Sequence, residues 1–197
     1  MFRSRRKPEM VPKGFTLLEI MVAMAILVTG LLAMALLMAR MYRQTVRSRY
    51  MSMAASLASE KLEDLSRYKQ GDPAVCSAGG SLTADSGPVS VTCNSLTSSV
   101  NYYDTVTVSL SNGAMSETYA SLNGAAIQYV TQQFTADGIY HAPTNSATAP
   151  LGTTFNRRWT IEKDIPVAGV RLVTVLVTLV DLSIQPPVTF QMSMVRP

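Results

Sequence analysis

A single carboxylate, Glu19, lies inside the most apolar stretch of the sequence, FTLLEIMVAMAILVTGLLAMALLMA. Residues 15–39, which make up this stretch, contain no other charged side chain. An ionised side chain inside a membrane-spanning helix costs up to about 2.5–3.5 kcal/mol on insertion scales, so we expect a partner that offsets this cost. The chemistry open to Glu19 is therefore ion pairing in an apolar environment, and the question is which cation it meets.

Other residue types that could do chemistry are few. His141 is the only histidine, and no nucleophile-elbow sequence accompanies it, so we expect a solvated side chain on a polar loop rather than a member of a catalytic triad. The sequence contains no Gly-rich phosphate loop, and its aspartates are not spaced as a calcium loop. These patterns predict no catalytic residue, no metal site and no cofactor, and hence a protein that is not an enzyme.

Cys76 and Cys93 are the only two cysteines, and they lie in a region rich in Gly, Ser and Thr. A zinc site is not expected, because no second pair of ligands accompanies them. If this region is exported, a disulfide between Cys76 and Cys93 is the first interpretation, and two unpaired buried thiols are the alternative. Closing the loop between them would stabilise the fold by about 3 kcal/mol.

Basic residues are concentrated at the N-terminus. Residues 1–14 carry a side-chain net charge of +4, which equals the net charge of the whole chain. Because the remainder sums to zero, we expect no nucleic-acid-binding surface. A smaller basic run follows the apolar stretch, at Arg40, Arg43, Arg47 and Arg49. Basic residues beside a membrane span favour the cytoplasmic side, so this run opposes export of the C-terminal region, and the N-terminal cluster outweighs it.

A long helix must position Glu19. Residues 15–39 would form a helix about 37 Å long, enough to cross the roughly 30 Å apolar core of a bilayer. Residues 40–71 contain no Gly or Pro before Gly71, and they form an amphipathic pattern. The apolar positions of this pattern include Met53, Leu57, Leu62, Leu65 and Tyr68. We therefore predict one helix from about residue 15 to residue 69, apolar all round in its first part and amphipathic in its second.

A β-rich domain, residues 72–197, is predicted by Ser, Thr, Gly and Val enrichment and by alternation with a period of two. The expected strands are 89–93, 103–110, 116–121, 127–134, 155–163, 170–181 and 188–195. Residues 155–181 should form a hairpin that turns at Pro166–Gly169, and the last strand should bury one face. Residues 135–154, TADGIYHAPTNSATAPLGTT, are expected to form a long connecting loop.

The N-terminus has three interpretations. A secretory signal peptide would be cut after one of the A-x-A matches at residues 23–25 or 33–35, but this interpretation gives Glu19 no role. A plain uncleaved membrane anchor likewise leaves Glu19 without a partner. The third interpretation rests on the junction Lys13-Gly14-Phe15, which is followed by Thr16-Leu17-Leu18 and an acid.

The stretch KGFTLLEIMVAMAIL resembles the N-terminal signal of type IV pilins and type II secretion pseudopilins, in which a prepilin peptidase cuts after Gly and methylates the new N-terminus. The resemblance implies cleavage between Gly14 and Phe15, N-methylation of Phe15, and loss of residues 1–14 as a basic leader. Glu19 becomes the fifth residue of the mature chain. It can then neutralise the Phe15 amine of a neighbouring subunit, which would set docking and register in a helical filament.

Two further stretches, AASLASEKLEDLSRY and RRWTIEKDI followed by VRLVTVLVTLVD, resemble minor pilins of the PilV type and the related minor pseudopilins. The resemblance implies an α+β, type IV pilin-like fold, in which a long N-terminal helix packs against a C-terminal antiparallel sheet. Residues 15–39 would be the transmembrane or filament-core half of this helix, and residues 40–71 the amphipathic half. Residues 72–197 would be the exported domain.

The function implied is that of a minor type IV pilin, a structural subunit that primes pilus assembly or modifies the pilus tip for adhesion, twitching motility or DNA uptake. A minor pseudopilin of a type II secretion system is the close alternative, and a membrane-anchored extracytoplasmic binding domain is an alternative of another class. The implied partners are the prepilin peptidase, other pilins or pseudopilins through the N-terminal helix, and the inner membrane before assembly. The mature chain would stand in an extracellular pilus or a periplasmic pseudopilus.

Overall fold

The computed structural model describes residues 14–197, except residues 87, 112–113, 124–125, 135–139 and 182. Residues 1–13 of the expected leader thus lie outside the described residues. The chain divides into two compact units, Met1–Thr45 and Val46–Pro197, and each is treated by itself below. Helix α1 (Leu17–Arg67) runs through both, whereas every strand lies in the second.

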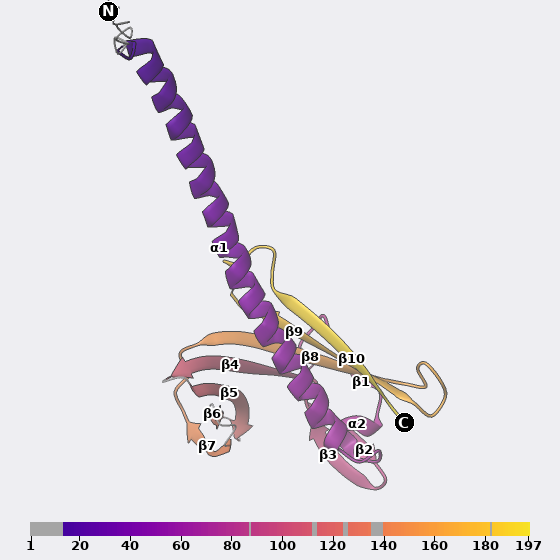
Figure 1. The fold of residues 1–197 in the computed structure, drawn as a ribbon. Helices are drawn as coiled ribbons and strands as arrows, with labels where there is room; N and C mark the ends of the chain where they lie inside the picture. Colours follow the sequence, from indigo (N-terminus) through magenta and orange to yellow (C-terminus); the bar gives the residue numbers. More distant parts are fainter. Residues whose placement is uncertain (1–13, 87, 112–113, 124–125, 135–139, 182) are drawn as a thin grey trace, which may run out of the picture. The chain divides into compact units, whose positions relative to one another are not determined.

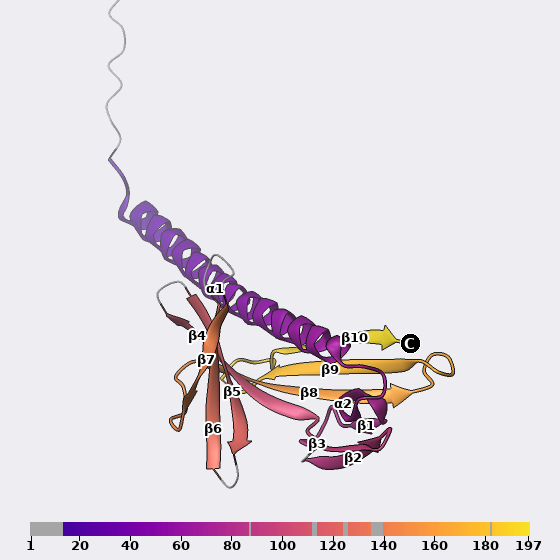
Figure 2. The same ribbon diagram turned by 90° about the horizontal axis from the view of Figure 1, so that it is seen from below.

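The part of α1 that begins at Val46 lies along one face of a β-sheet, as Figures 1 and 2 show. Its buried side chains follow a helical stripe, as the amphipathic pattern predicts. They are Ala54, Leu57, Ala58, Leu62 and Leu65. The α+β arrangement of a long N-terminal helix on a C-terminal antiparallel sheet is therefore confirmed.

A second helix of a single turn, α2 (Pro73–Cys76), follows α1 and was not predicted. Asp72 caps it, since its side chain accepts a hydrogen bond of 2.9 Å from the backbone N–H of Ala74. Pro73 at the first helical position suits this start, because its fixed φ is already helical. Pro73 therefore begins α2 and cannot continue α1, because it has no backbone N–H to donate.

The sheet domain contains ten strands among the described residues. They are β1 (Gly79–Gly80), β2 (Val89–Cys93), β3 (Leu96–Val100), β4 (Tyr103–Ser111), β5 (Ala114–Asn123), β6 (Ala126–Phe134), β7 (Tyr140–Ser146), β8 (Thr153–Lys163), β9 (Arg171–Leu179) and β10 (Thr189–Arg196). All seven expected strands are present. The main sheet has the order β10-β9-β8-β4-β5-β6-β7, with β1 added beside β8, and β2 and β3 form a separate antiparallel pair.

The hairpin of β8 and β9 is confirmed, with Lys163 opposite Arg171 next to the turn. The expectation of one long loop over residues 135–154 is wrong in part, because residues 140–146 form β7 against β6. His141 therefore lies in a strand, opposite Gln133, and not on a loop. The sequence pattern did not predict β7 because a strand is recognised by alternating apolar residues, and β7 is mostly polar. Its backbone hydrogen bonds to β6 need no apolar face.

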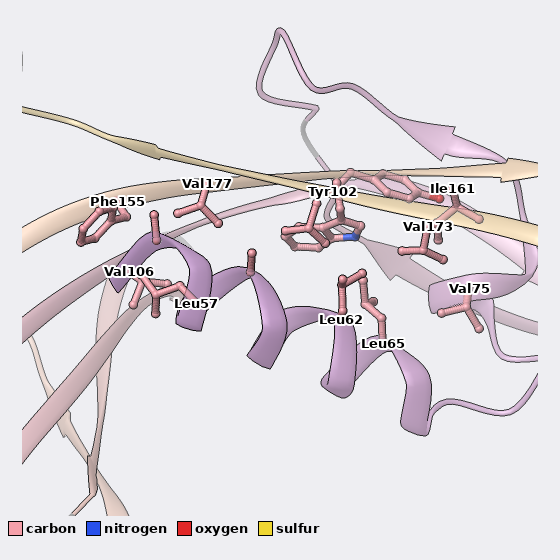
Figure 3. Close-up of a cluster of buried hydrophobic side chains, with 14 of the residues drawn as sticks. Leu57, Leu62, Leu65, Val75, Tyr102, Val106, Phe155, Ile161, Val173 and Val177 are labelled. Atoms are coloured by element: carbon pink, nitrogen blue, oxygen red, sulfur yellow. The ribbon is translucent and has the colours of Figure 1, made fainter. Parts of the chain in front are cut away.

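The core lies between α1 and the inner face of β4, β8 and β9. Alternate side chains of each strand point toward the helix, as Figure 3 shows for Phe155, Ile161, Val173 and Val177. Each of these is at most 1% exposed. Burying one such side chain contributes about 1.5–3 kcal/mol, so these contacts hold the helix on the sheet.

A disulfide joins Cys76 of α2 to Cys93 of β2, with Cα atoms 6.5 Å apart. This is the pairing that the sequence suggests. Just beyond Cys93, Asn94 and Ser95 have φ values of 50° and 66°, and these form the two-residue turn between β2 and β3. Positive φ at both positions is typical of a type I′ hairpin, which favours Asn at the first. The disulfide thereby fixes this turn next to the end of α1.

Candidate functional site

The junction Gly14-Phe15 lies in a short non-helical segment directly before α1. Residues 14–16 have no regular secondary structure, and the helix begins at Leu17. Gly14 is exposed, and Phe15 is 80% exposed. A peptidase must bind its substrate in an extended conformation, so a bond just outside the first turn of a helix can be reached without unwinding the helix.

Thr16 is the cap of α1. Its side-chain oxygen accepts a hydrogen bond of 3.3 Å from the backbone N–H of Glu19, and its carbonyl oxygen lies 3.1 Å from the same nitrogen. Thr followed three positions later by Glu is the sequence pattern of a capping box. The sequence contains this signal, but Glu19 was not predicted to have a capping role from it. The carboxylate also lies in the first turn, where the helix dipole favours negative charge.

In the first unit, residues 15–39 of the described chain present an apolar surface with one acid, Glu19. Every residue from Gly14 to Thr45 is exposed, including many Leu, Met, Val and Ile side chains of α1. The helix is long and apolar enough to cross a membrane, judged by its length and composition alone. No ion pair in the described part of the chain involves Glu19. The apolar side chains of this unit are thus exposed, and its one acid has no ion-pair partner within the described residues.

A buried ion pair in the second unit joins two strands of the sheet beside α1. Arg157 of β8 donates two hydrogen bonds to the carboxylate of Asp104 of β4, at 2.8 and 2.9 Å. A third donor of the same guanidinium lies 3.4 Å from the carbonyl oxygen of Leu57 in α1. The side chain of Arg157 is 3% exposed. Burial alone would lower the pKa of Arg157, but Asp104, together with Tyr119 and Glu60, outweighs burial and raises the pKa, so the guanidinium stays charged.

Lys61 of α1 extends this network. Its ammonium lies 3.6 Å from Asp104 and 3.4 Å from Asp64, and 4.3 Å from the centre of the Trp159 ring. A cation above an indole ring is attracted by its π electrons. The network was not predicted, although one signal for it is present. Arg157 lies between Phe155 and Trp159 at the same inward-facing alternation, which places its side chain on the helix-facing side of the sheet.

Next to this ion pair, two carboxylates share one hydroxyl group. The Tyr119 oxygen lies 2.6 Å from Glu60 Oε1 and 2.6 Å from Glu117 Oε2. A phenol has one hydrogen to donate, so two hydrogen bonds at these distances require a proton on one of the carboxyl groups. Burial first, and then the neighbouring Glu60, raise the pKa of Glu117 from its ordinary 4.5 to about 7. Glu117 is 2% exposed and holds this proton most readily.

This proton makes the stability of the second unit depend on pH. The pKa of Glu117 is higher in the folded chain than in the unfolded chain, so the folded state binds more protons between about pH 4.5 and 7. The stabilising contribution is therefore complete below pH 4.5 and is lost as the pH rises through 7. In the wild type, the free energy of unfolding should fall by up to about 3 kcal/mol over this pH range. Glu117→Gln imitates the protonated form, so we expect its free energy of unfolding not to show this fall. Chemical unfolding of the full chain in detergent at pH 5 and pH 8 measures it.

Glu63→Gln is the matched control. Glu63 lies on the same helix segment as Glu60, is 66% exposed, and among the described residues its carboxylate pairs with Arg67 alone, at 2.8 Å. Removing this charge should leave the difference in the free energy of unfolding between pH 5 and pH 8 unchanged, because the carboxylate is solvated in both the folded and the unfolded state. If the free energy of unfolding changed between pH 5 and pH 8 by the same amount in the wild type and in Glu117→Gln, the assignment of the proton to Glu117 would be wrong.

Among the described residues, no group of three or more His, Cys, Asp or Glu side chains is arranged to hold a metal ion. The chemically distinctive features are therefore the exposed junction before α1, the apolar helix with one acid, and the buried polar network under the second part of the helix.

Comparison with known protein families finds a match at the N-terminus. Residues 12–37 match the family described as "Prokaryotic N-terminal methylation motif". The matched segment contains the Gly14-Phe15 junction, the Thr16 cap and Glu19. No curated protein and no solved structure matches the chain. The match supports a type IV pilin-like or pseudopilin-like protein, and together with the apolar helix it fits a membrane-anchored precursor.

Proposed function

We propose that this protein is a minor type IV pilin, a structural subunit that is cut at Gly14-Phe15, methylated at Phe15 and built into a pilus through α1. The observation that carries the proposal is the methylation motif at residues 12–37, which spans the start of α1 and the exposed bond before it. Prepilin peptidase and other pilins are the partners that such a motif implies. The resemblance to minor pilins of the PilV type supplies the finer assignment.

The apolar surface of α1 would be in contact first with lipid and later with the helices of other subunits. In the precursor, lipid would surround residues 15–39, since a helix of this length can cross a bilayer. In the assembled filament, helices of neighbouring subunits would replace the lipid. This second environment gives Glu19 a cation, because cleavage creates a positively charged amine at Phe15. A buried pair of this kind adds little net stability but strongly penalises a wrong register, because a shifted helix leaves both charges unpaired.

Mass spectrometry of the mature N-terminus tests the proposal. The expected chain begins at Phe15, lacks residues 1–14 and carries one additional methyl group. Gly14→Ala should leave the precursor uncut. A Cβ at Gly14 would meet no atom within 4 Å, so the described fold tolerates the change and the loss of processing reports on the peptidase.

Gly30→Ala is the matched control. A Cβ at Gly30 also meets no atom within 4 Å, and Ala is the better helix former by about 1 kcal/mol. This variant should be processed like the wild type. Cleavage near Ala25 or Ala35, or an intact Met1 in the mature protein, would overturn the proposal in favour of a signal peptide or a plain anchor.

The location of the processed chain separates the pilus from the secretion system. A minor pilin should be recovered in filaments sheared from the cell surface, whereas a minor pseudopilin should stay in the periplasm with the envelope fraction. The same motif precedes both, so this second candidate function rests on the same observation.

A further inference from the structure

Three cations lie side by side across one end of the main sheet. Lys163 of β8 is directly opposite Arg171 of β9, and Arg171 is directly opposite Arg196 of β10. All three lie in register with the inward-facing residues of their strands, on the side that faces α1. Side chains directly opposite each other in antiparallel strands have Cβ atoms about 4.5–5.5 Å apart. The fold therefore brings three positive charges into one row.

Such a row opposes folding unless something offsets it, because like charges directly opposite each other are destabilising. The repulsion on Arg196 is partly offset at the end of α1, where its guanidinium donates hydrogen bonds to the carbonyl oxygens of Leu65 and Tyr68. Burial first, and then the charge of Arg171, lower the pKa of Arg196. The carbonyls are only partial charges, so they do not neutralise the row.

Arg171 and Lys163 have no carboxylate partner among the described residues. The nearby acids are engaged elsewhere. The carboxylate of Asp72 caps α2, and that of Asp164 accepts the backbone N–H of Gly169 at 2.8 Å. Glu162 follows the alternation of β8 onto the opposite face of the sheet.

The two unpaired cations line a cavity of about 310 Å³. One nitrogen of Arg171, Nη1, is buried and has no hydrogen-bond partner. A buried charged donor without a partner costs more than a neutral one, and native structures satisfy almost all such groups. The amides of Gln70 and Asn94 line the same cavity and can add further donors. The cavity therefore offers several donors and two positive charges to a ligand that must bring acceptors and negative charge.

A disulfide forms part of the cavity lining. Cys76 and Cys93 both line the cavity, and their disulfide ties the β2–β3 turn to α2. The side chain of Asn94 in that turn lies against Gly71, where a Cβ would collide with its amide. Figure 2 shows α2, β2 and the hairpin end of β8 and β9 at the same end of the domain. The disulfide therefore lines the cavity and also joins the two ends of residues 76–93.

We propose that this cavity is an anion site that binds a phosphate group. A carboxylate offers two oxygens and one charge, which match a single guanidinium fork. A phosphate offers three or more oxygens and up to two charges, which match Arg171 and Lys163 together with the flanking amides. The bound group accepts hydrogen bonds from the donors that line the cavity and relieves the repulsion along the row of cations.

Thermal unfolding of the full chain in a neutral detergent, with inorganic phosphate as the probe, tests the site. At a hundred times its dissociation constant, phosphate should raise the Tm by about 5 °C or more, whereas chloride at the same ionic strength should not. Arg171→Gln and Lys163→Gln should each weaken phosphate binding at least about tenfold. Arg171→Gln should also unfold at an equal or higher temperature than the wild type without phosphate, since it removes repulsion, so loss of binding is not loss of fold.

Arg49→Gln is the matched control, because it removes one exposed positive charge of the same domain away from the cavity. It should bind phosphate like the wild type. Cys76→Ser/Cys93→Ser should weaken binding without changing the charge of the site. Equal phosphate stabilisation of Arg171→Gln and Arg49→Gln, or no stabilisation beyond that of chloride, would overturn the proposal.

A second pair of probes identifies the source of the phosphate. Short-chain phosphatidylglycerol that competes with inorganic phosphate, where short-chain phosphatidylcholine does not, assigns the cavity to an anionic lipid headgroup. If inorganic phosphate binds and phosphatidylglycerol does not compete, the cavity takes a soluble phosphate or a phosphorylated molecule. For either result to be assigned to this cavity, the Arg171→Gln variant must lose the binding of inorganic phosphate and any competition by phosphatidylglycerol.

Discussion

Glu19→Gln is expected to reduce recovery of the protein in filaments about a hundredfold or more, while cleavage and membrane insertion stay intact. Removing one partner of a buried ion pair costs about 3–5 kcal/mol, because the other charge is left uncompensated in an apolar environment. The charge left behind is the amine of Phe15. The measurement compares the variant in sheared filaments with the variant in the membrane fraction, after mass spectrometry has verified the N-methylated terminus.

The choice of Gln separates two roles of Glu19 that the structure brings together. Its backbone N–H is bound by Thr16, and its position is that of the acid in a capping box. Gln can occupy this position as Glu does, so Glu19→Gln removes the charge and keeps the cap. Thr16→Ala does the opposite, with a cost of about 0.5–2 kcal/mol to the start of the helix.

The two variants therefore make opposite predictions. If pairing with the amine is the role of Glu19, Thr16→Ala is incorporated nearly normally and Glu19→Gln is not. If capping is the role, Thr16→Ala is the more damaging change. Normal recovery of Glu19→Gln in sheared filaments would remove the pairing hypothesis altogether.

The sequence predicts those parts of the fold that depend on local pattern. The absence of Gly and Pro between residues 31 and 70 and the stripe at Leu57, Leu62 and Leu65 predict α1, which ends at Arg67 rather than near residue 69. The β8–β9 hairpin follows from alternation around one turn. α2 is a single turn, and β3 and β7 are largely polar, so none of them produces a periodic signal.

The missed sites depend on pairs that are distant in the sequence. Arg157 meets Asp104 53 residues away, and Tyr119 meets Glu60 59 residues away. The register of three strands places Arg171 between two other cations. Strand order and register decide these neighbours, and neither can be obtained from composition or spacing. The N-terminal junction could be predicted because its residues are consecutive.

Arg157→Gln should lower the Tm of the second unit by about 10 °C. The change leaves the carboxylate of Asp104 without its bidentate partner in a site where its side chain is 18% exposed. Breaking a buried pair costs about 3–5 kcal/mol, and Lys61 at 3.6 Å keeps the expected effect near the lower value. Fluorescence of Trp159, the only tryptophan, reports the loss, because its ring packs beneath Lys61 of α1.

The neighbouring residue supplies the control, since Arg158 pairs with Asp85 on the opposite face of the sheet, where the carboxylate is 52% exposed. Arg158→Gln should cost less than about 1 kcal/mol, as is usual for a solvated pair. The double variant Arg157→Met/Asp104→Leu should recover most of the stability, because apolar side chains can replace a buried pair at little cost. A double variant as unstable as Arg157→Gln would mean that the pair with Asp104 is not the main contribution of Arg157. Its contacts with α1, at the carbonyl of Leu57 and at Glu60, would then account for the loss.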